Sequence, residues 1–307
     1  MSLKDLHNRQ LKVAGMTDLK AMPWQSFMEF ISPTADRFGI LTGLLAKAKL
    51  EYNVIEFAGY RHIILNPPKP DQMSRSPTLL VAHYDRAQGS PGANDNSAGV
   101  FILIETALKL KKKNVNDWRI IFTDGEELKP GESIQAQGSY SLAEGLKNSR
   151  IEKSRIFCFD TCGRGDTLLI STTLEQLIKK EEGRSKIKES IMELRNLALN
   201  TARKLRMKKV LLAPTPFSDD AGFFRAGMAA QTITMLPSDE CNLLVSELRK
   251  NQEFAEVLIN AELRQNTSQQ SIPETWRGLN SAVDSHLRLT PKHFKTVGNF
   301  IEALCEG

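Results

Sequence analysis

The side chains that could bind a metal ion or move a proton occur in four short segments of the chain. Each segment lies at the end of a predicted strand or just beyond one. The side chains are His83 with Asp85, Asp95, Glu126 with Glu127, and Asp160. In open α/β sheets, ligands collect at the carboxyl ends of the strands. We therefore expect these side chains to meet at one edge of the sheet.

His83 follows the apolar run 78–82, and Asp85 comes two positions later. A histidine that binds a metal usually donates its other ring N–H to a carboxylate, which fixes the tautomer and the orientation of the ring. A structural histidine is the alternative, because a single short motif is weak support for a metal site. The pair predicts that His83 is a metal ligand and that Asp85 orients it.

Asp95 lies in the run Asn94 to Ser97, directly before an apolar segment that predicts a helix. Asp and Asn are common N-cap residues, so capping is the simplest role for Asp95. The run holds more cap-forming residues than one helix start needs. An aspartate at this turn could instead bridge two cations with its two oxygens.

Glu126 and Glu127 are adjacent and follow the apolar run 118–122. Adjacent carboxylates repel each other, so a division of labour fits better: one binds a metal and the other takes a proton from the attacking water. Asp160 ends the apolar run 155–159. Burial of a carboxylate there is costly unless it is paired, hydrogen-bonded or bound to a metal, although a turn residue at the strand end is the alternative.

The elements that must position these side chains are predicted from the pattern of apolar residues. A helix runs from about Thr34, as its N-cap, to Leu50, and a hairpin follows around Ala58-Gly59. The predicted strands are 52–57, 62–65, 78–82, 118–122, 155–159, 210–212 and 231–235, and further predicted helices are 98–110, 139–146 and 290–304. The alternation of strands and helices after Thr78 is typical of an α/β fold with buried strands.

Two further segments are polar and helical in pattern, a charged one near 174–205 and a second near 240–270. The sequence shows no internal repeat and no low-complexity tract. We therefore expect a single catalytic domain over residues 1–307, in which these two segments are helical insertions.

The composition is that of an ordinary globular protein, with 41% apolar and 25% charged residues. The net charge of +5 comes from basic residues spread along predicted helices, and no nucleic-acid motif accompanies them, so we expect no nucleic-acid partner. No apolar run reaches the roughly 20 residues that span a bilayer, so we expect no membrane partner. Four cysteines without a C-x-x-C pair favour a reducing compartment, and we expect the cytoplasm. A signal peptide removed before residue 1 is the alternative.

The order His, Asp, Glu-Glu, Asp, with each group after a strand, resembles the co-catalytic zinc aminopeptidase family, which includes bacterial leucyl aminopeptidases, glutamate carboxypeptidases and glutaminyl cyclases. The resemblance extends from about Thr34 to Leu304 and includes Gly138-Ser139 and Phe217-Ser218-Asp219. It implies a three-layer sandwich with a mixed, mostly parallel sheet flanked by helices. It also implies that His83 and Asp160 bind one zinc, that Glu127 binds another and that Asp95 bridges them. Glu126 would then be the general base, and the Asp95–Asn96 peptide bond would be cis.

The chain departs from this family at two positions. Asp220 stands where family members usually carry a histidine. Asn280 stands where they carry their last histidine ligand, and His286 is the other candidate for that role. The register of Asp284 and of Leu289-Thr290-Pro291 favours Asn280. Because an amide oxygen is a weaker zinc ligand than imidazole, we expect the second of the two zinc sites to be weak.

The residues and the resemblance together predict a zinc-dependent aminopeptidase that binds one or two zinc ions and cleaves peptides or amino-acid derivatives. A water activated by the metal would attack the N-terminal peptide bond, with Glu126 as general base. One alternative is a glutaminyl cyclase-like acyltransferase. Another is a metal-poor, weak or inactive relative that acts as a binding protein, and Asn280 and Asp220 favour it. The sequence predicts neither the preferred N-terminal residue nor the oligomeric state.

Overall fold

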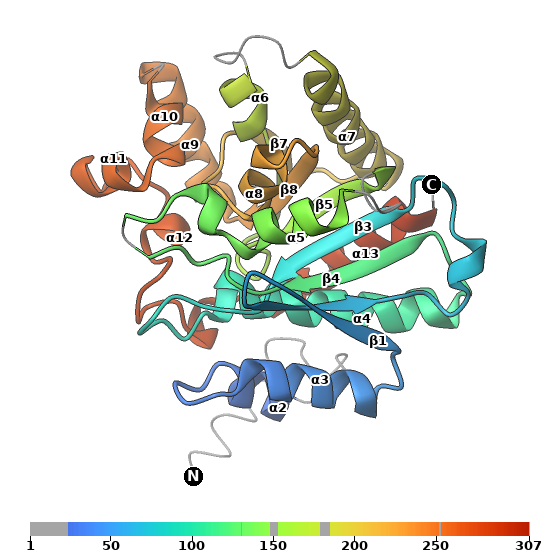
Figure 1. The fold of residues 1–307 in the computed structure, drawn as a ribbon. Coiled ribbons are helices and arrows are strands. Elements are labelled where there is room, and N and C mark those ends of the chain that lie inside the picture. The colour runs from blue at the N-terminus through green and yellow to red at the C-terminus, as the bar shows by residue number, and fades with distance from the viewer. Residues whose placement is uncertain (1–23, 130, 148–152, 179–184, 252, 307) are drawn as a thin grey trace.

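The computed structural model describes residues 24–129, 131–147, 153–178, 185–251 and 253–306, and its centre is one eight-stranded sheet (Figure 1). The strand order is β1-β2-β4-β3-β5-β8-β6-β7. The strands span Tyr52–Phe57 (β1), Tyr60–Leu65 (β2), Thr78–His83 (β3), Trp118–Thr123 (β4), Arg155–Phe159 (β5), Thr167–Ser171 (β6), Val210–Ala213 (β7) and Ala230–Leu236 (β8). Neighbouring strands are parallel from β4 through β3 and β5 to β8, while β1, β2 and β6 have antiparallel neighbours. The expected mixed, mostly parallel sheet is confirmed.

Helices cover both faces of the sheet, because the strands alternate their apolar side chains between the faces. Leu80 and Ala82 of β3 join the core cluster that contains α4 and α13, whereas Leu79 and Val81 join the cluster of α5 and α8. Burial of each such leucine or valine contributes about 1.5–3 kcal/mol. Described helices span Trp24–Phe30 (α2), Arg37–Lys47 (α3), Ala98–Lys112 (α4), Gly138–Leu146 (α5), Thr173–Ile178 (α6), Ser185–Lys204 (α7), Asp219–Arg225 (α8), Ser238–Lys250 (α9), Phe254–Ile259 (α10), Ala261–Asn266 (α11), Glu274–Arg277 (α12) and Phe294–Glu306 (α13).

The N-terminal helices α2 and α3 pack on the same core cluster as α4 (Figure 1). The predicted N-cap Thr34 is wrong: Asp36 caps α3, and its carboxylate accepts a hydrogen bond from the backbone N–H of Gly39 at 3.0 Å. Across the described residues, no helix combines the length and the apolar character that a membrane span needs.

The later part of the chain differs from the prediction in its detail. The strand β6 was not predicted, and it lies between β8 and β7. The segment 174–205 contains the helices α6 and α7, and residues 179–184 between them lie outside the described residues. The segment 240–270 contains the three helices α9, α10 and α11 in place of one long helical stretch. The terminal helix α13 begins at Phe294, after a 3₁₀ turn at Pro291–His293.

Candidate metal centre and catalytic pocket

The predicted metal ligands meet where three neighbouring parallel strands end. His83 is the last residue of β3 and is level with Thr123, the last residue of β4. Asp160 directly follows β5. The His83 ring is fully buried, and its Nε2 lies 3.1 Å from Asp95 Oδ1 and 3.6 Å from Asp160 Oδ1. Ligand atoms of these three residues lie within 4.8 Å of one another.

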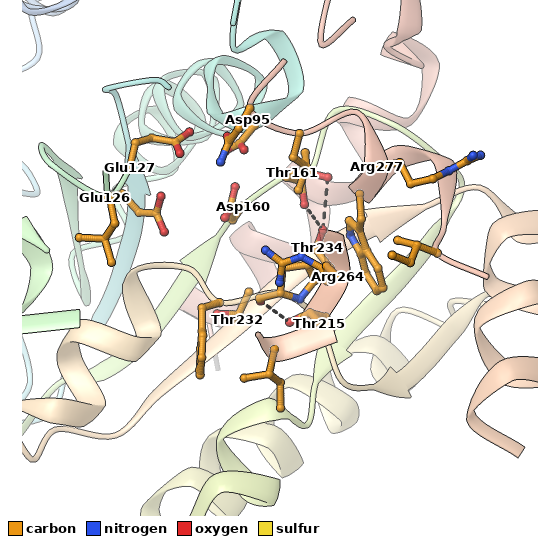
Figure 2. A pocket seen from close by; sticks show the side chains of 18 of the residues that line it. Asp95, Glu126, Glu127, Asp160, Thr161, Thr215, Thr232, Thr234, Arg264 and Arg277 are labelled. Atoms are coloured by element: carbon orange, nitrogen blue, oxygen red, sulfur yellow. Dashed lines mark hydrogen bonds between the residues drawn. The ribbon is translucent and has the colours of Figure 1, made fainter. Parts of the chain in front are cut away.

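Glu126 and Glu127 lie on the other side of His83, in the loop after β4. Ligand atoms of His83, Glu126 and Glu127 also fall within 4.8 Å of one another, so the two groups share the histidine. Figure 2 shows Glu126 and Glu127 on one side of a shared space and Asp95 and Asp160 on the other side. The sequence-predicted carboxylates are thus brought together at one edge of the sheet.

Asp85 contacts both the histidine and the loop that carries the glutamates. Its Oδ1 lies 3.3 Å from His83 Nδ1, although Nδ1 makes no hydrogen bond within the described residues. The carboxylate accepts hydrogen bonds from the backbone N–H groups of Glu126, at 3.2 Å, and Glu127, at 3.0 Å. Asp85 therefore lies beside the imidazole and holds the backbone of the two glutamates, a second role that was not predicted.

Asp95 is held in place by partners from distant segments. The backbone N–H of Asp95 and that of Asn94 donate to the carboxylate of Asp284, at 3.0 and 2.9 Å. The Asp95–Asn96 peptide bond is cis, as the family resemblance implied. The capping interpretation is wrong, because the N-cap of α4 is Ser97 and no side chain makes a cap hydrogen bond there. The carboxylate of Asp95 is instead directed to His83.

Arg37 of α3 connects two loops, called the metal loops below. One follows β3 and contains Asp85, and the other contains Asp95. Its guanidinium donates to the carbonyls of Tyr84 and Asp85 at 3.0 and 2.8 Å, and to those of Pro91 and Gly92 at 2.7 and 3.3 Å. Sequence reasoning missed this residue, because a single arginine in an amphipathic helix carries no local signal of such a role.

Without a cation, the buried carboxylates of the cluster repel one another. Burial, together with neighbouring carboxylates, raises the pKa of Glu126 and Glu127 well above the usual range and that of Asp95 to about 6. Burial lowers the pKa of His83, but contacts with Asp160, Asp85 and Asp95 raise it well above the usual value.

A divalent cation fits this set of donors. His83 Nε2, Asp160 Oδ1 and Glu127 Oε1 are buried and have no hydrogen-bond partner within the described part of the chain. Buried polar atoms without partners are rare in native proteins and call for an explanation such as an ion. Imidazole nitrogen and carboxylate oxygen are ligands that zinc commonly takes.

A pocket of about 400 Å³ opens beside the cluster. Asp95, Glu126, Glu127, Asp160 and Asn280 all line it. His286 is not among the described residues that line the pocket. Its ring lies edge-on to the Trp24 ring, with the two ring centroids 5.8 Å apart. Asn280 thus borders the pocket beside the cluster, and the choice of Asn280 over His286 as a ligand stays a prediction.

Two further aspartates are buried beneath the cluster, at the start of α8. Asp219 accepts a hydrogen bond from Thr123 Oγ1 at 2.7 Å, and burial raises its pKa to about 6. Asp220 accepts one from the backbone N–H of Ser218 at 3.1 Å, and burial raises its pKa to about 7. The position where the family resemblance implied a histidine thus holds a buried carboxyl group.

Comparison with known proteins adds an independent line of support. A family model described as Peptidase family M28 matches residues 63–277. No curated protein sequence matches the chain. A leucine aminopeptidase precursor from Bacteroides thetaiotaomicron is similar with a TM-score of 0.61 and 17% identity, and the alignment covers 91% of this chain and 93% of that one. A glutaminyl cyclase from the same organism is similar with a TM-score of 0.57 and 17% identity, covering 87% of each chain.

The chain also matches the zinc aminopeptidase BSAP from Bacillus subtilis, at 18% identity and a TM-score of 0.48, with 80% of this chain covered. The match spans about half, 49%, of that protein's length. At such identities the likeness to the leucine aminopeptidase precursor and to the glutaminyl cyclase shows the fold alone. That fold is the zinc exopeptidase-like α/β sandwich that the sequence predicted.

Proposed function

Because the chain belongs to peptidase family M28, we propose that it is a zinc-dependent exopeptidase that removes the N-terminal residue from peptides or amino-acid derivatives. The observation that carries this proposal is the cluster at the strand ends. His83 lies within ligand distance of Asp95 and Asp160 on one side and of Glu126 and Glu127 on the other, beside an open pocket.

We assign His83 and Asp160 to one zinc ion, Glu127 and Asn280 to a second, and Asp95 to a bridge between them. The position of Asp95 supports the bridge, because it contacts His83 and lines the pocket together with Glu127 and Asn280. When bound, zinc polarises the substrate carbonyl and lowers the pKa of water.

Glu126 is placed to move protons. Its Oε1 accepts a hydrogen bond from Gln137 Nε2 at 3.1 Å, and its backbone N–H is held by Asp85. These contacts fix the side chain and leave its other oxygen directed to the pocket that it lines. Glu126 takes a proton from the attacking water and delivers it to the leaving amine, as a general base and then a general acid.

The test is hydrolysis of amino-acid p-nitroanilides and amides by the zinc-loaded protein, with zinc content measured in the same samples. Activity should disappear with a chelator and return with zinc. Glu126→Gln should lower kcat by about 10²–10⁴-fold while zinc content stays unchanged. Glu132→Gln is the control, because Glu132 lies exposed in the same loop and should retain activity. A zinc-loaded protein that cleaves no N-terminal bond would exclude the exopeptidase proposal.

The second candidate function is a binding protein without catalytic activity. Asn280 at the pocket favours it, because with Asn280 as a ligand the second zinc ion would lack an imidazole. This candidate predicts zinc binding without any turnover. Glutaminyl cyclase activity belongs in the same assay, with conversion of a peptide with N-terminal glutamine to its pyroglutamyl form as the readout.

A further inference from the structure

An arginine lies on the pocket wall across from the acidic cluster. The short helix α11 carries Arg264, and Figure 2 shows its side chain reaching into the pocket on the side away from Glu126 and Glu127. One guanidinium nitrogen donates to the backbone carbonyl of Leu258. The helix thereby places a permanent positive charge in a pocket whose other end is negative.

Arg264 has no carboxylate partner within the described part of the chain. Other partly buried arginines of the same region do: Arg164 pairs with Glu240 at 2.8 Å. Burial lowers the pKa of Arg264, and no nearby acid opposes that effect. A guanidinium has five N–H donors and stays charged, so its burial without a counter-ion is costly.

The walls around Arg264 suit one end of a small polar ligand. Thr215, Thr232 and Thr234 line the pocket near it (Figure 2), and Trp276 and Leu279 add apolar surface. An arginine fork fits a carboxylate in a planar, bidentate geometry, which is why this side chain is common where carboxylates are recognised.

We infer that this pocket selects substrates that carry a carboxylate, and that Arg264 is the specificity-determining residue that binds it. The inference rests on the proposed exopeptidase function. The substrate's scissile bond lies at the acidic cluster and its carboxylate at Arg264. The carboxylate has two sources, the side chain of an N-terminal glutamate or aspartate and the C-terminal α-carboxylate of a dipeptide.

Two matched substrate pairs distinguish these sources in the zinc-loaded protein. The first pair is glutamyl and glutaminyl p-nitroanilide, and the second is Ala-Ala and Ala-Ala-amide. The wild type should favour the charged member of one pair by about 10–100-fold in kcat/KM, as a charge-assisted hydrogen bond implies. The pair that shows the preference identifies the source.

Arg264→Gln should abolish that preference, measured as the ratio of kcat/KM for the charged and the neutral member of the pair. Arg277→Gln is the matched control: Arg277 also borders the pocket, but it is exposed and points away from the acidic cluster in Figure 2. The preference should persist in that variant. Melting temperatures of both variants show that they fold.

Two results would overturn the inference while leaving the exopeptidase function intact: a wild type without preference in either pair, or a preference that survives Arg264→Gln. If no substrate is cleaved, the proposed function fails instead. Binding of L-glutamate then tests whether Arg264 recognises a carboxylate. Calorimetry with L-glutamate should show a Kd at least about tenfold higher for Arg264→Gln than for the wild type and Arg277→Gln. Equal Kd values in all three proteins would rule out a carboxylate site at Arg264.

Discussion

We expect the side chain of Asn280 to limit how tightly the cluster binds a second zinc ion. Asn280 lines the pocket with a backbone φ of 58°, in the left-handed region that asparagine and histidine adopt more readily than most side chains. Its amide oxygen is a poor substitute for imidazole at a zinc ion. The backbone at this position would accept a histidine, so we propose that the weakness of the second zinc site comes from the Asn280 side chain alone.

Replacing Asn280 by His should therefore increase zinc binding at the second site. At a fixed free zinc concentration, the wild type should hold about one tightly bound ion per chain and Asn280→His about two. Equilibrium dialysis with elemental analysis measures this ratio. His286→Ala is the control and should bind zinc like the wild type. Loss of zinc in His286→Ala, with no gain in Asn280→His, would show that His286 is the ligand.

Asp220 makes the stability of the protein dependent on pH. Its pKa of about 7 in the fold lies above the value of about 3.9 in an unfolded chain, so the folded state binds more protons between these values. Stability should then fall as pH rises from about 4 to 7, and Asp220→Asn should remove the part of that loss that comes from Asp220. Because Asn can still accept the hydrogen bond from the Ser218 N–H, the variant should gain on the order of a few kcal/mol at pH 8 and almost nothing at pH 4.5.

Urea unfolding of the wild type and Asp220→Asn in the presence of a chelator, at pH 4.5 and pH 8, measures this difference. Asp71→Asn, an exposed aspartate outside the core, is the control, and its free energy of unfolding should change by less than about 0.5 kcal/mol at either pH. An Asp220→Asn variant that is no more stable than the wild type at pH 8 would contradict the buried-charge explanation.

Secondary-structure elements were predictable where the apolar pattern was bounded by clear signals. The strands that carry His83 and Asp160 were predicted to within one residue of their observed ends, because turn-forming residues flank their apolar runs. Strand β6 was missed: its apolar run, Leu168 to Ile170, is short, and periodicity alone does not tell such a run from a segment of a buried helix. The segment 240–270 is interrupted next to Asn251 and Asn260, which serve as C-caps of α9 and α10.

The contact between α3 and the metal loops was not predictable, because the partners of Arg37 in those loops lie 47 to 60 residues away in the chain. The same holds for Asp284, which holds the Asp95 loop from 189 residues away. Side chains in short local motifs, including Asp85 beside His83, were visible in the sequence, whereas Arg37 and Asp284, which contact the backbone of distant loops, were not. The reason is that a hydrogen bond to a backbone carbonyl or a backbone N–H selects no particular residue type in its partner.

Arg37→Met should test this positioning role. The change leaves buried carbonyls of both metal loops without a donor, so the free energy of unfolding should fall by about 3 kcal/mol or more. Zinc affinity should fall by about 10–100-fold, as is typical when support around metal ligands is lost. Competition with a fluorescent zinc chelator gives the affinity, and urea unfolding gives the stability.

Arg119→Met is the matched control for that variant. Arg119 lies in β4, outside the two metal loops, and its guanidinium donates to Asn66 Oδ1 at 2.8 Å. It should lower stability while leaving zinc affinity within about threefold of the wild type. Equal losses of zinc affinity in both variants would mean that α3 acts only through general stability.

At the scale of the whole molecule, the site is assembled from segments spread over most of the described chain. α3, the ends of β3, β4 and β5, the loop around Asp95 and the region of Asn280 and Asp284 all contribute to it. Without a cation, the folded state concentrates buried carboxylates that repel one another, and the unfolded chain does not. Zinc binds the folded arrangement and has no comparable site in the unfolded chain, so zinc binding should stabilise the entire fold.

Zinc should consequently raise the melting temperature of the wild type. A free concentration one hundred times the Kd adds about 2.7 kcal/mol, which corresponds to roughly 5 °C for a chain of this size. Since zinc ligands must be deprotonated and the pKa values of Asp95 and Glu127 are raised, the shift should be larger at pH 8 than at pH 6. Calorimetric melting with zinc, with magnesium alone and with chelator measures the shift.

His83→Ala should lose the zinc-dependent shift, because both groups of ligands share this histidine. An equal shift in His83→Ala would place the stabilising zinc elsewhere on the protein.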